Sequence, residues 1–383
     1  MAITAPSDVL LPEELTELGK PREEATGLAA RLYTDPAILE AEKEKIFRRE
    51  WMAMLHESTV REPGDFRTIE MAGESYLFVR GEDGELRCFH NICRHRGARV
   101  AADESGSCSM FRCPYHKWSY DLRGRLIGAP TMAHVVEEGH SLVEVKTDQW
   151  LGFVFINLDG NAAPLAERLG GLDELLSPWL TEAKLDLLYE IPYEGHWNWK
   201  LTVENANEGY HVIGSHFDSA NWLIPGDLTY SPSDASRPHY TTYRMPFEEG
   251  RSMSEFAFDA VQMENLPDWV NREFRFFQIY PNFLISLSPD NVTGYICLPG
   301  TEPGRVMFHW VCVVHPETKN RPQYEEYRRV QMDWSNTIQG EDQYPCETMW
   351  ANVHSPAFIP GRYAQGEEAV YDFDQWYLER MSS

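Results

Sequence analysis

Between Trp51 and about Leu158, short apolar runs alternate with clusters of turn-forming residues. Glu62-Pro-Gly-Asp65 and Gly81-Glu-Asp-Gly84 are two such clusters. Short apolar or alternating runs bounded by Gly, Pro and Asp are typical of β-strands. The pattern therefore predicts an all-β module, with strands at 51–55, 66–71, 75–80, 86–92 and 151–158.

Helical periodicity appears on both sides of this module. Residues 35–51 alternate charged positions with Ala, Ile, Leu and Phe at helical spacing, which predicts an amphipathic helix. Beyond residue 161, helical stretches precede strand-like runs at 274–287, 293–298 and 306–314. A long helix is predicted after Pro322, from the spacing of Tyr327, Val330, Trp334 and Ile338. The second half of the chain is therefore predicted to be an α+β domain.

Composition and charge limit the function classes. With 383 residues the chain is longer than a typical single domain. Its formal charge of −26 argues against nucleic acid and against an anionic membrane as partners. It suits a basic protein partner, although a solvated acidic surface is the favoured explanation.

The chain has no feature of a secreted or membrane protein. Residues 1–26 lack a basic segment followed by an apolar one, so we expect no secretory signal. No apolar run approaches the ~20 residues that span a bilayer. The seven cysteines show no repeating spacing, which indicates a reducing compartment, and we expect a cytoplasmic protein.

Two short motifs combine a cysteine with a histidine: Cys93-Arg-His95 and Cys113-Pro-Tyr-His116. Two thiolates can hold one iron of a [2Fe–2S] cluster while two imidazoles hold the other. A Cys2His2 zinc site uses the same ligand types and remains an alternative. Zinc motifs usually pair like ligands, whereas each motif here is mixed, which favours the cluster.

A second candidate metal site lies near the middle of the chain. The run from Asn198 to His216, which contains Glu208 and His211, reads as a helix leading into a turn. A helix broken near Gly214 would let both imidazoles converge. A carboxylate would complete a two-histidine, one-carboxylate iron site with open positions. Taken alone, two histidines at this spacing are a weak signal.

The motifs together resemble the α subunits of Rieske non-haem iron oxygenases. Cys93-Arg-His95-Arg-Gly97 and the segment Cys113–Gly124 are similar to the two cluster-binding loops, except that Lys117 stands where glycine is often found. The segment 198–216 is similar to the mononuclear iron motif. The resemblance implies cluster ligands Cys93, His95, Cys113 and His116, and iron ligands His211, His216 and a carboxylate from a late helix.

The late carboxylate has two candidates. Gln339-Gly-Glu341-Asp342 is the matching stretch, and we choose Asp342, with Glu341 as the alternative. The resemblance further implies that Glu208 bridges a cluster histidine and an iron-side histidine across a subunit boundary. Asn205 is expected just outside the iron ligands. Glutamate at position 208, Gly361-Arg-Tyr363 and the segment 373–377 resemble the branch acting on choline, betaine and carnitine.

The resemblance also implies the fold and the partners. We expect an N-terminal helical segment (1–48) packed on the catalytic domain, an all-β Rieske domain (49–160), and an α+β catalytic domain (161–383) with a central antiparallel, helix-grip-like sheet. Electrons would come from NAD(P)H through a separate reductase, with or without a ferredoxin, because the chain lacks G-x-G-x-x-G and the plant-ferredoxin cysteine pattern. A homotrimer is the expected assembly.

The expected reaction uses O2 to hydroxylate a C–H bond next to nitrogen in a small organic substrate, ending in N-dealkylation or C–N cleavage. Ring hydroxylation of an arene is the alternative. An electron carrier and a zinc-stabilised binding protein are more distant ones. Seven aromatic residues are candidates for a cation-binding pocket or for sheet core: Phe274, Phe276, Phe277, Tyr280, Phe283, Tyr295 and Trp310. Phe276 and Phe277 are neighbours, so only one can face a pocket from a strand.

Overall fold

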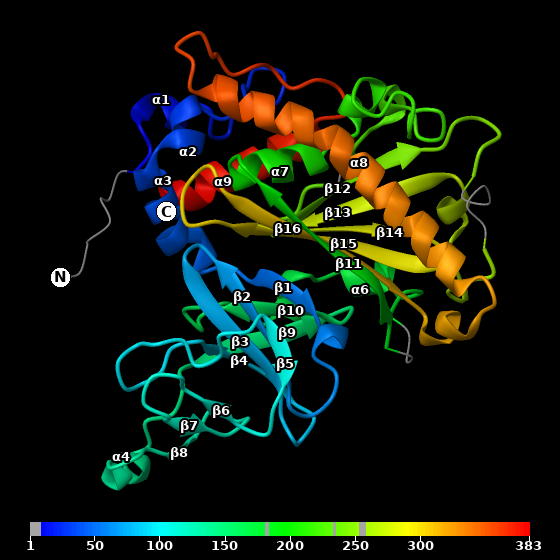
Figure 1. Ribbon diagram of the computed structural model, residues 1–383. Coiled ribbons are helices and arrows are strands. Elements are labelled where there is room, and N and C mark those ends of the chain that lie inside the picture. The colour runs from blue at the N-terminus through cyan, green and yellow to red at the C-terminus, as the bar shows by residue number, and fades with distance from the viewer. Residues whose placement is uncertain (1–8, 181–183, 233–234, 253–257) are drawn as a thin grey trace.

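The computed structural model describes residues 9–180, 184–232, 235–252 and 258–383. These residues form a mostly β lower part and a mixed helix–sheet upper part (Figure 1). This arrangement confirms the predicted α+β class with an all-β module. In the described part of the chain, no helix is long and apolar enough to cross a membrane.

The lower part contains a seven-stranded sheet in the order β1-β10-β9-β4-β3-β2-β5 and a three-stranded sheet in the order β6-β7-β8. Their strands alternate or run buried, as expected for sheets that cover a core. The bounds are β1 Met52–His56, β2 Asp65–Met71, β3 Glu74–Arg80, β4 Leu86–His90, β5 Ser105–Ser107, β6 Phe111–Arg112, β7 Ser119–Tyr120, β8 Leu126–Gly128, β9 Glu144–Trp150 and β10 Phe153–Asn157. The short helices α4 (Ala133–Glu137), α5 (Leu165–Arg168) and α6 (Leu172–Leu175) follow β8 and β10.

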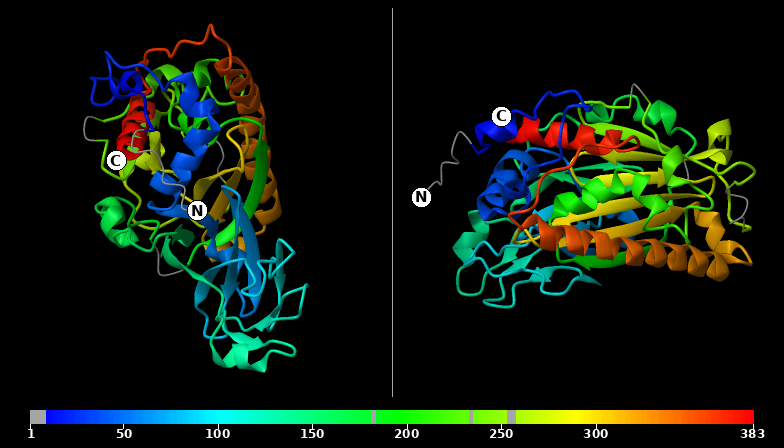
Figure 2. Two further views of the ribbon diagram at one scale, coloured as in Figure 1. Left: turned by 90° about the vertical axis from the view of Figure 1, so that its left-hand side faces the viewer. Right: turned by 90° about the horizontal axis from the view of Figure 1, so that it is seen from above.

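The upper part is built on a six-stranded antiparallel sheet in the order β11-β16-β15-β14-β13-β12. Helices α7, α8 and α9 lie together over one face of it, as the view from above shows (Figure 2). The bounds are β11 Asp186–Gly195, α7 Trp199–Ala206, β12 Tyr240–Pro246, β13 Glu273–Ile279, β14 Phe283–Leu287, β15 Asn291–Pro299, β16 Val306–Val314, α8 Tyr324–Val353 and α9 Glu368–Ser382.

The two large sheets pack against each other through aromatic side chains. Phe153 of β10 and Phe283 of β14 have ring centroids 4.6 Å apart. A Cβ at Gly294 of β15 would lie 2.6 Å from the Phe153 ring, so only glycine permits this approach. The seven-stranded sheet therefore covers the face of the six-stranded sheet that is opposite to α7–α9.

The N-terminal segment comprises α1 (Pro12–Leu15), α2 (Ala30–Thr34) and α3 (Pro36–Glu42), which continues into a π-helical turn at Lys43–Phe47. Glu42 is fully buried and accepts hydrogen bonds from Lys200 (2.5 Å), Trp199 and Tyr377. A buried carboxylate needs such partners. The segment thus contacts α7 and α9, while the predicted domain boundaries at 48 and 160 stay predictions.

Two elements differ from the prediction. The apolar run 274–287 is not one strand but the hairpin of β13 and β14, which Tyr280-Pro281-Asn282 separates. The helix before His211 ends at Ala206, well ahead of Gly214. A 3-10 helix, η3 (Tyr210–Ile213), then carries His211, so the break that brings the histidines together comes earlier than expected.

Candidate metal centres

The two Cys/His loops have the same backbone design. The Gly97 amide donates to the Cys93 carbonyl and the Lys117 amide to the Cys113 carbonyl, both at 3.0 Å. Gly97 and Lys117 close these turns with φ of 78° and 63°. Lys117 therefore occupies the position equivalent to a glycine, in a left-handed conformation that disfavours side chains.

In the two loops, the cysteines form one pair and the histidines form another. Cys93 and Cys113 are buried and lie against each other. The Nδ1 atoms of His95 and His116 are 3.1 Å apart near the surface. The Tyr120 hydroxyl lies 3.3 Å from the Cys93 sulfur, and the Trp118 ring stacks on His95 at 4.9 Å. Two thiols on one side and two imidazoles on the other fit a binuclear cluster with one pair per iron.

The zinc alternative does not fit this geometry. A tetrahedral zinc holds its donors at 2.0–2.3 Å, which puts all four within about 4 Å of one another. Among the described residues, the only group of three or more such donors within 4.8 Å of one another is His211, His216 and Asp342. The four donor atoms of the Cys/His loops are therefore too far apart to bind a single zinc ion.

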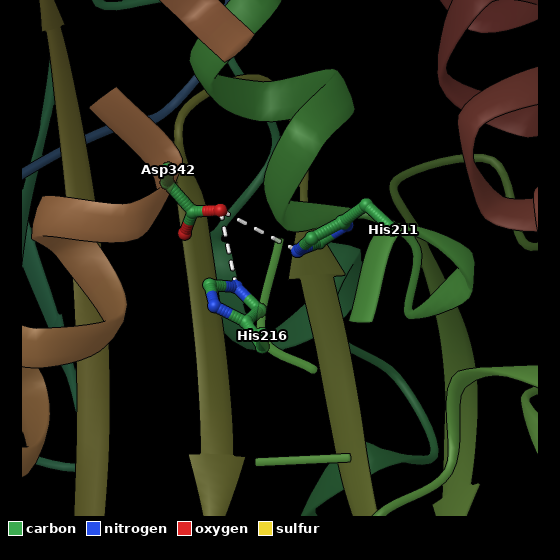
Figure 3. A group of neighbouring side chains, drawn as sticks. All are labelled: His211, His216 and Asp342. Carbon is green, nitrogen blue, oxygen red and sulfur yellow. Dashed lines mark ion pairs between the residues drawn. The ribbon is translucent and has the colours of Figure 1, made fainter. Parts of the chain in front are cut away.

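The second centre joins segments that are distant in sequence (Figure 3). Asp342 Oδ1 lies 3.1 Å from His216 Nε2 and 3.5 Å from His211 Nε2. The histidines come from η3 and the turn after it, and Asp342 from the middle of α8. The structure thus brings the three predicted ligands together, and their donor set suits Fe(II) with open coordination positions.

Each histidine of the triad has a second carboxylate at its other ring nitrogen. Glu208 lies 2.5 Å from His211 Nδ1, and Glu341 lies 2.7 Å from His216 Nδ1. Ser219 donates to the same Glu341 oxygen at 2.5 Å. A carboxylate at Nδ1 fixes the tautomer and leaves Nε2 free for a metal. Glu341, the alternative ligand, therefore holds a histidine instead of joining the convergent donors.

The half-buried His211 imidazole is surrounded by carboxylates, among them Glu208 and Asp342. Burial disfavours its protonated imidazole, yet the Glu208 carboxylate outweighs burial and raises the pKa of His211 to about 8. Asn205 of α7 donates from Nδ2 to Asp342 Oδ1 at 3.4 Å, so it lies just outside the triad as expected. Sequence reasoning missed Ser219, which no motif singles out.

A glycine fixes the approach of this loop to the sheet. A Cβ at Gly209 would lie 2.4 Å from Thr229 Oγ1 and 2.6 Å from Met245 Cε. Gly209 therefore lets the chain between Glu208 and His211 pack directly on β12.

A cavity of about 170 Å³ opens beside the triad, between the six-stranded sheet and helices α7 and α8. Of the aromatic candidates, four line it (Phe274, Phe276, Tyr295 and Trp310). Phe277, Tyr280 and Phe283 belong to the core instead. Phe276 faces the cavity and Phe277 does not, as strand alternation requires. Five lining aromatics were not singled out as pocket candidates from the sequence: Tyr189, Trp197, Tyr243, Phe308 and Trp334.

Comparison with known families matches both halves of the chain. The family described as "Ring hydroxylating alpha subunit (catalytic domain)" matches residues 183–383, and the family described as "Rieske [2Fe-2S] domain" matches residues 50–145. The first match contains the iron triad and the second contains the Cys/His loops.

Individual relatives of the chain are oxygenase subunits, in agreement with these two family matches. The glycine betaine monooxygenase oxygenase subunit of Chromohalobacter salexigens is 28% identical over 92% of this chain and 85% of its own. The carnitine monooxygenase oxygenase subunit of Escherichia coli K12 is 36% identical over 55% of this chain and 56% of its own. A solved quaternary ammonium Rieske monooxygenase, whose structure addresses carnitine oxidation and inter-subunit electron transfer, superposes with a TM-score of 0.78, 25% identity and 97% coverage of both chains. This chain therefore belongs to the ring-hydroxylating alpha-subunit family, as the Rieske [2Fe–2S] and mononuclear-iron oxygenase component of its enzyme.

Proposed function

We propose that the enzyme monooxygenates a C–H bond next to nitrogen and so removes an N-alkyl group from an amine. The observation that carries this proposal is the triad of His211, His216 and Asp342 at the wall of an aromatic-lined cavity of about 170 Å³. That volume suits a small organic molecule. Two relatives are named for glycine betaine and carnitine, which are both N-methylated amines.

Within this proposal, each metal-site residue has one role. Cys93, His95, Cys113 and His116 hold the cluster, and His211, His216 and Asp342 hold the iron. The iron supplies the oxygen chemistry when it is bound. Glu208, Glu341 and Asn205 orient the three iron ligands, and the aromatic walls exclude water from the substrate.

We propose that electrons pass from the cluster of one subunit to the iron centre of its neighbour, and that the subunits form a homotrimeric ring. The cluster loops lie in the lower part of the molecule, whereas α7 and α8 lie beyond the six-stranded sheet (Figure 1). Electrons within one chain would have to cross both sheets. The His116 side chain is exposed and free to meet a neighbouring copy. Head-to-tail contacts of this kind close into rings, and Glu208 is the residue positioned to receive a partner's cluster histidine.

A reductase must supply the electrons. We propose a separate NAD(P)H-dependent reductase, with or without a ferredoxin, that docks at the exposed edge of the Rieske domain.

The function is tested by a coupled assay with a surrogate reductase. The panel contains trimethylated amines, N-alkyl aromatics and simple arenes, and the readout is formaldehyde or another aldehyde together with the shortened amine. We expect aldehyde from at least one amine. If the assay yields hydroxylated arenes and no aldehyde, the function is ring hydroxylation and not N-dealkylation.

Glu341 gives a prediction about metal affinity. We expect Glu341→Gln to weaken Fe(II) binding by roughly 10- to 100-fold, because a neutral amide holds the His216 tautomer less firmly than a carboxylate. Titration of the metal-depleted protein with Fe(II) or Co(II) measures this. Glu347→Gln is the matched control, since Glu347 lies half-buried on the same helix and accepts a hydrogen bond from Gln343 instead of from a histidine. If the two variants bind the metal ion with equal affinity, Glu341 does not position His216 for metal binding.

A further inference from the structure

We infer that the cavity takes a positively charged amine that carries no carboxylate. This inference rests on the proposed N-dealkylation and narrows its substrate class. It also separates this chain from relatives named for glycine betaine and carnitine, since each of those molecules has a carboxylate.

The charged groups around the cavity are acidic. Glu208 and Asp342 line it directly, and Glu341 lies behind His216 at 2.7 Å. Three carboxylates around one divalent ion leave a net negative charge at the metal end of the cavity. This field attracts a cation and repels an anion.

The walls add a second preference for a cation. Tyr243 and Phe276 stack with centroids 4.7 Å apart, and Tyr295 and Trp310 meet edge to face at 4.3 Å. All four line the cavity. Aromatic faces attract ammonium groups, and most strongly where water is excluded.

Among the described residues, no lysine or arginine lines the cavity, and its two histidines are the proposed iron ligands. The segments outside the described part (1–8, 181–183, 233–234 and 253–257) contain neither lysine nor arginine. Every lysine and arginine of the chain therefore lies in a described segment, including those adjacent in sequence to cavity-lining residues.

Two arginines alternate with cavity residues along the sheet. Arg244 lies between Tyr243 and Met245, and it pairs in register with Arg275, which lies between Phe274 and Phe276. Because successive side chains of a strand point to opposite faces, both arginines point away from the cavity. There, Glu273 lies 2.7 Å from Arg275 and 3.8 Å from Arg244.

The cations on the covering helices are also engaged elsewhere. Lys200 of α7 is fully buried against Glu42, with the rings of Tyr33 and Tyr377 around its ammonium group. On α8, Arg328 donates to the Leu188 carbonyl and Arg329 pairs with Asp333. A substrate carboxylate in the cavity would therefore be desolvated without a counter-charge, which is strongly unfavourable.

Matched pairs of ligands test the inference on the iron-loaded full chain. The small pair is choline and glycine betaine, and the aromatic pair is phenyltrimethylammonium and its 4-carboxylate. Calorimetry gives the dissociation constants, and the coupled assay gives kcat/KM from formaldehyde. We expect the member without the carboxylate to bind at least 10-fold more tightly, with a matching ratio in turnover where turnover occurs. Equal or tighter binding of the carboxylate in either pair overturns the inference, as does failure of both cations to bind. Tight binding without any aldehyde from the amine panel would instead reject N-dealkylation.

A charge introduced into the cavity supplies a second test. Gln331 lines the cavity from α8, whereas Gln343 is exposed on the same helix. We expect Gln331→Lys to shift the binding ratio of each pair at least 10-fold towards the carboxylate. Gln343→Lys should leave both ratios unchanged. An unchanged ratio in folded Gln331→Lys would overturn the electrostatic basis of the inference.

Discussion

Replacing His211 by alanine is expected to abolish product formation while the spectrum of the cluster stays intact. Within the described segments, His211 provides one of the three convergent donors at the second centre, and its Nε2 lies 3.5 Å from Asp342. The cluster ligands lie in the other half of the fold and do not contact it. We expect turnover to fall by at least about three orders of magnitude, which corresponds to about 4 kcal/mol of lost transition-state stabilisation.

The measurement combines steady-state turnover with metal analysis and EPR. The reduced variant should keep the rhombic cluster signal and two of the three irons of the wild-type chain. His354→Ala is the matched control, because His354 is an exposed histidine at the end of α8 that packs on Trp350. Substantial turnover in His211→Ala, with the control active, would refute the assignment of the iron site.

The cluster residues could be predicted from the sequence because their geometry is local. Each Cys/His pair lies in one tight loop after a strand, and two backbone hydrogen bonds to the cysteine close each loop. The position of Lys117 also carried information, since its left-handed backbone explains why glycine is the usual residue there. Sequence reasoning already assigned the two thiolates to one iron and the two imidazoles to the other. It could not provide the approach of the two loops, which brings His95 Nδ1 to 3.1 Å from His116 Nδ1.

The iron site was predictable only in part. His211 and His216 form a short motif, but Asp342 reaches them through the packing of α8 over the sheet. Adjacent residues on a helix point about 100° apart, so Glu341 and Asp342 cannot play the same role. Which of the two faces the Nε2 atoms depends on the rotation of α8, which one sequence does not reveal.

The strand predictions succeeded where turn residues interrupt apolar runs and failed where they do not. The apolar run 274–287 contains only Pro281 and Asn282 as breaks, so its hairpin was read as one strand. β11 and β12 were missed because Glu, Arg and Thr interrupt their apolar positions without strict alternation. These two strands supply Tyr189, Tyr243 and Met245 to the cavity wall, so that part of the substrate site lay outside what periodicity could predict.

At saturating Fe(II), Glu208→Gln is expected to hold both metal centres and to turn over roughly 100-fold more slowly than wild type, the upper end of the effect of an outer carboxylate. The amide can still accept a hydrogen bond from His211 Nδ1, although it holds the ring less firmly than the carboxylate does, as in Glu341→Gln. The substitution removes the negative charge that raises the pKa of His211, and with it the anionic acceptor that we propose bridges His211 and a partner's cluster histidine. The defect should lie in electron transfer from the reduced cluster and not in metal binding.

Stopped-flow measurement of cluster reoxidation in the presence of O2 and substrate tests this directly. We expect slow reoxidation in Glu208→Gln, and product formation close to wild type when hydrogen peroxide replaces O2 and the two electrons. Glu341→Gln is the informative contrast, because Glu341 contacts the equivalent nitrogen of His216 and should lower metal affinity without slowing cluster reoxidation at saturating Fe(II). Normal reoxidation in Glu208→Gln would contradict the role of Glu208 as the electron-transfer bridge. Equal reoxidation rates in the two variants at saturating Fe(II) would reduce Glu208 to a residue that only orients a ligand.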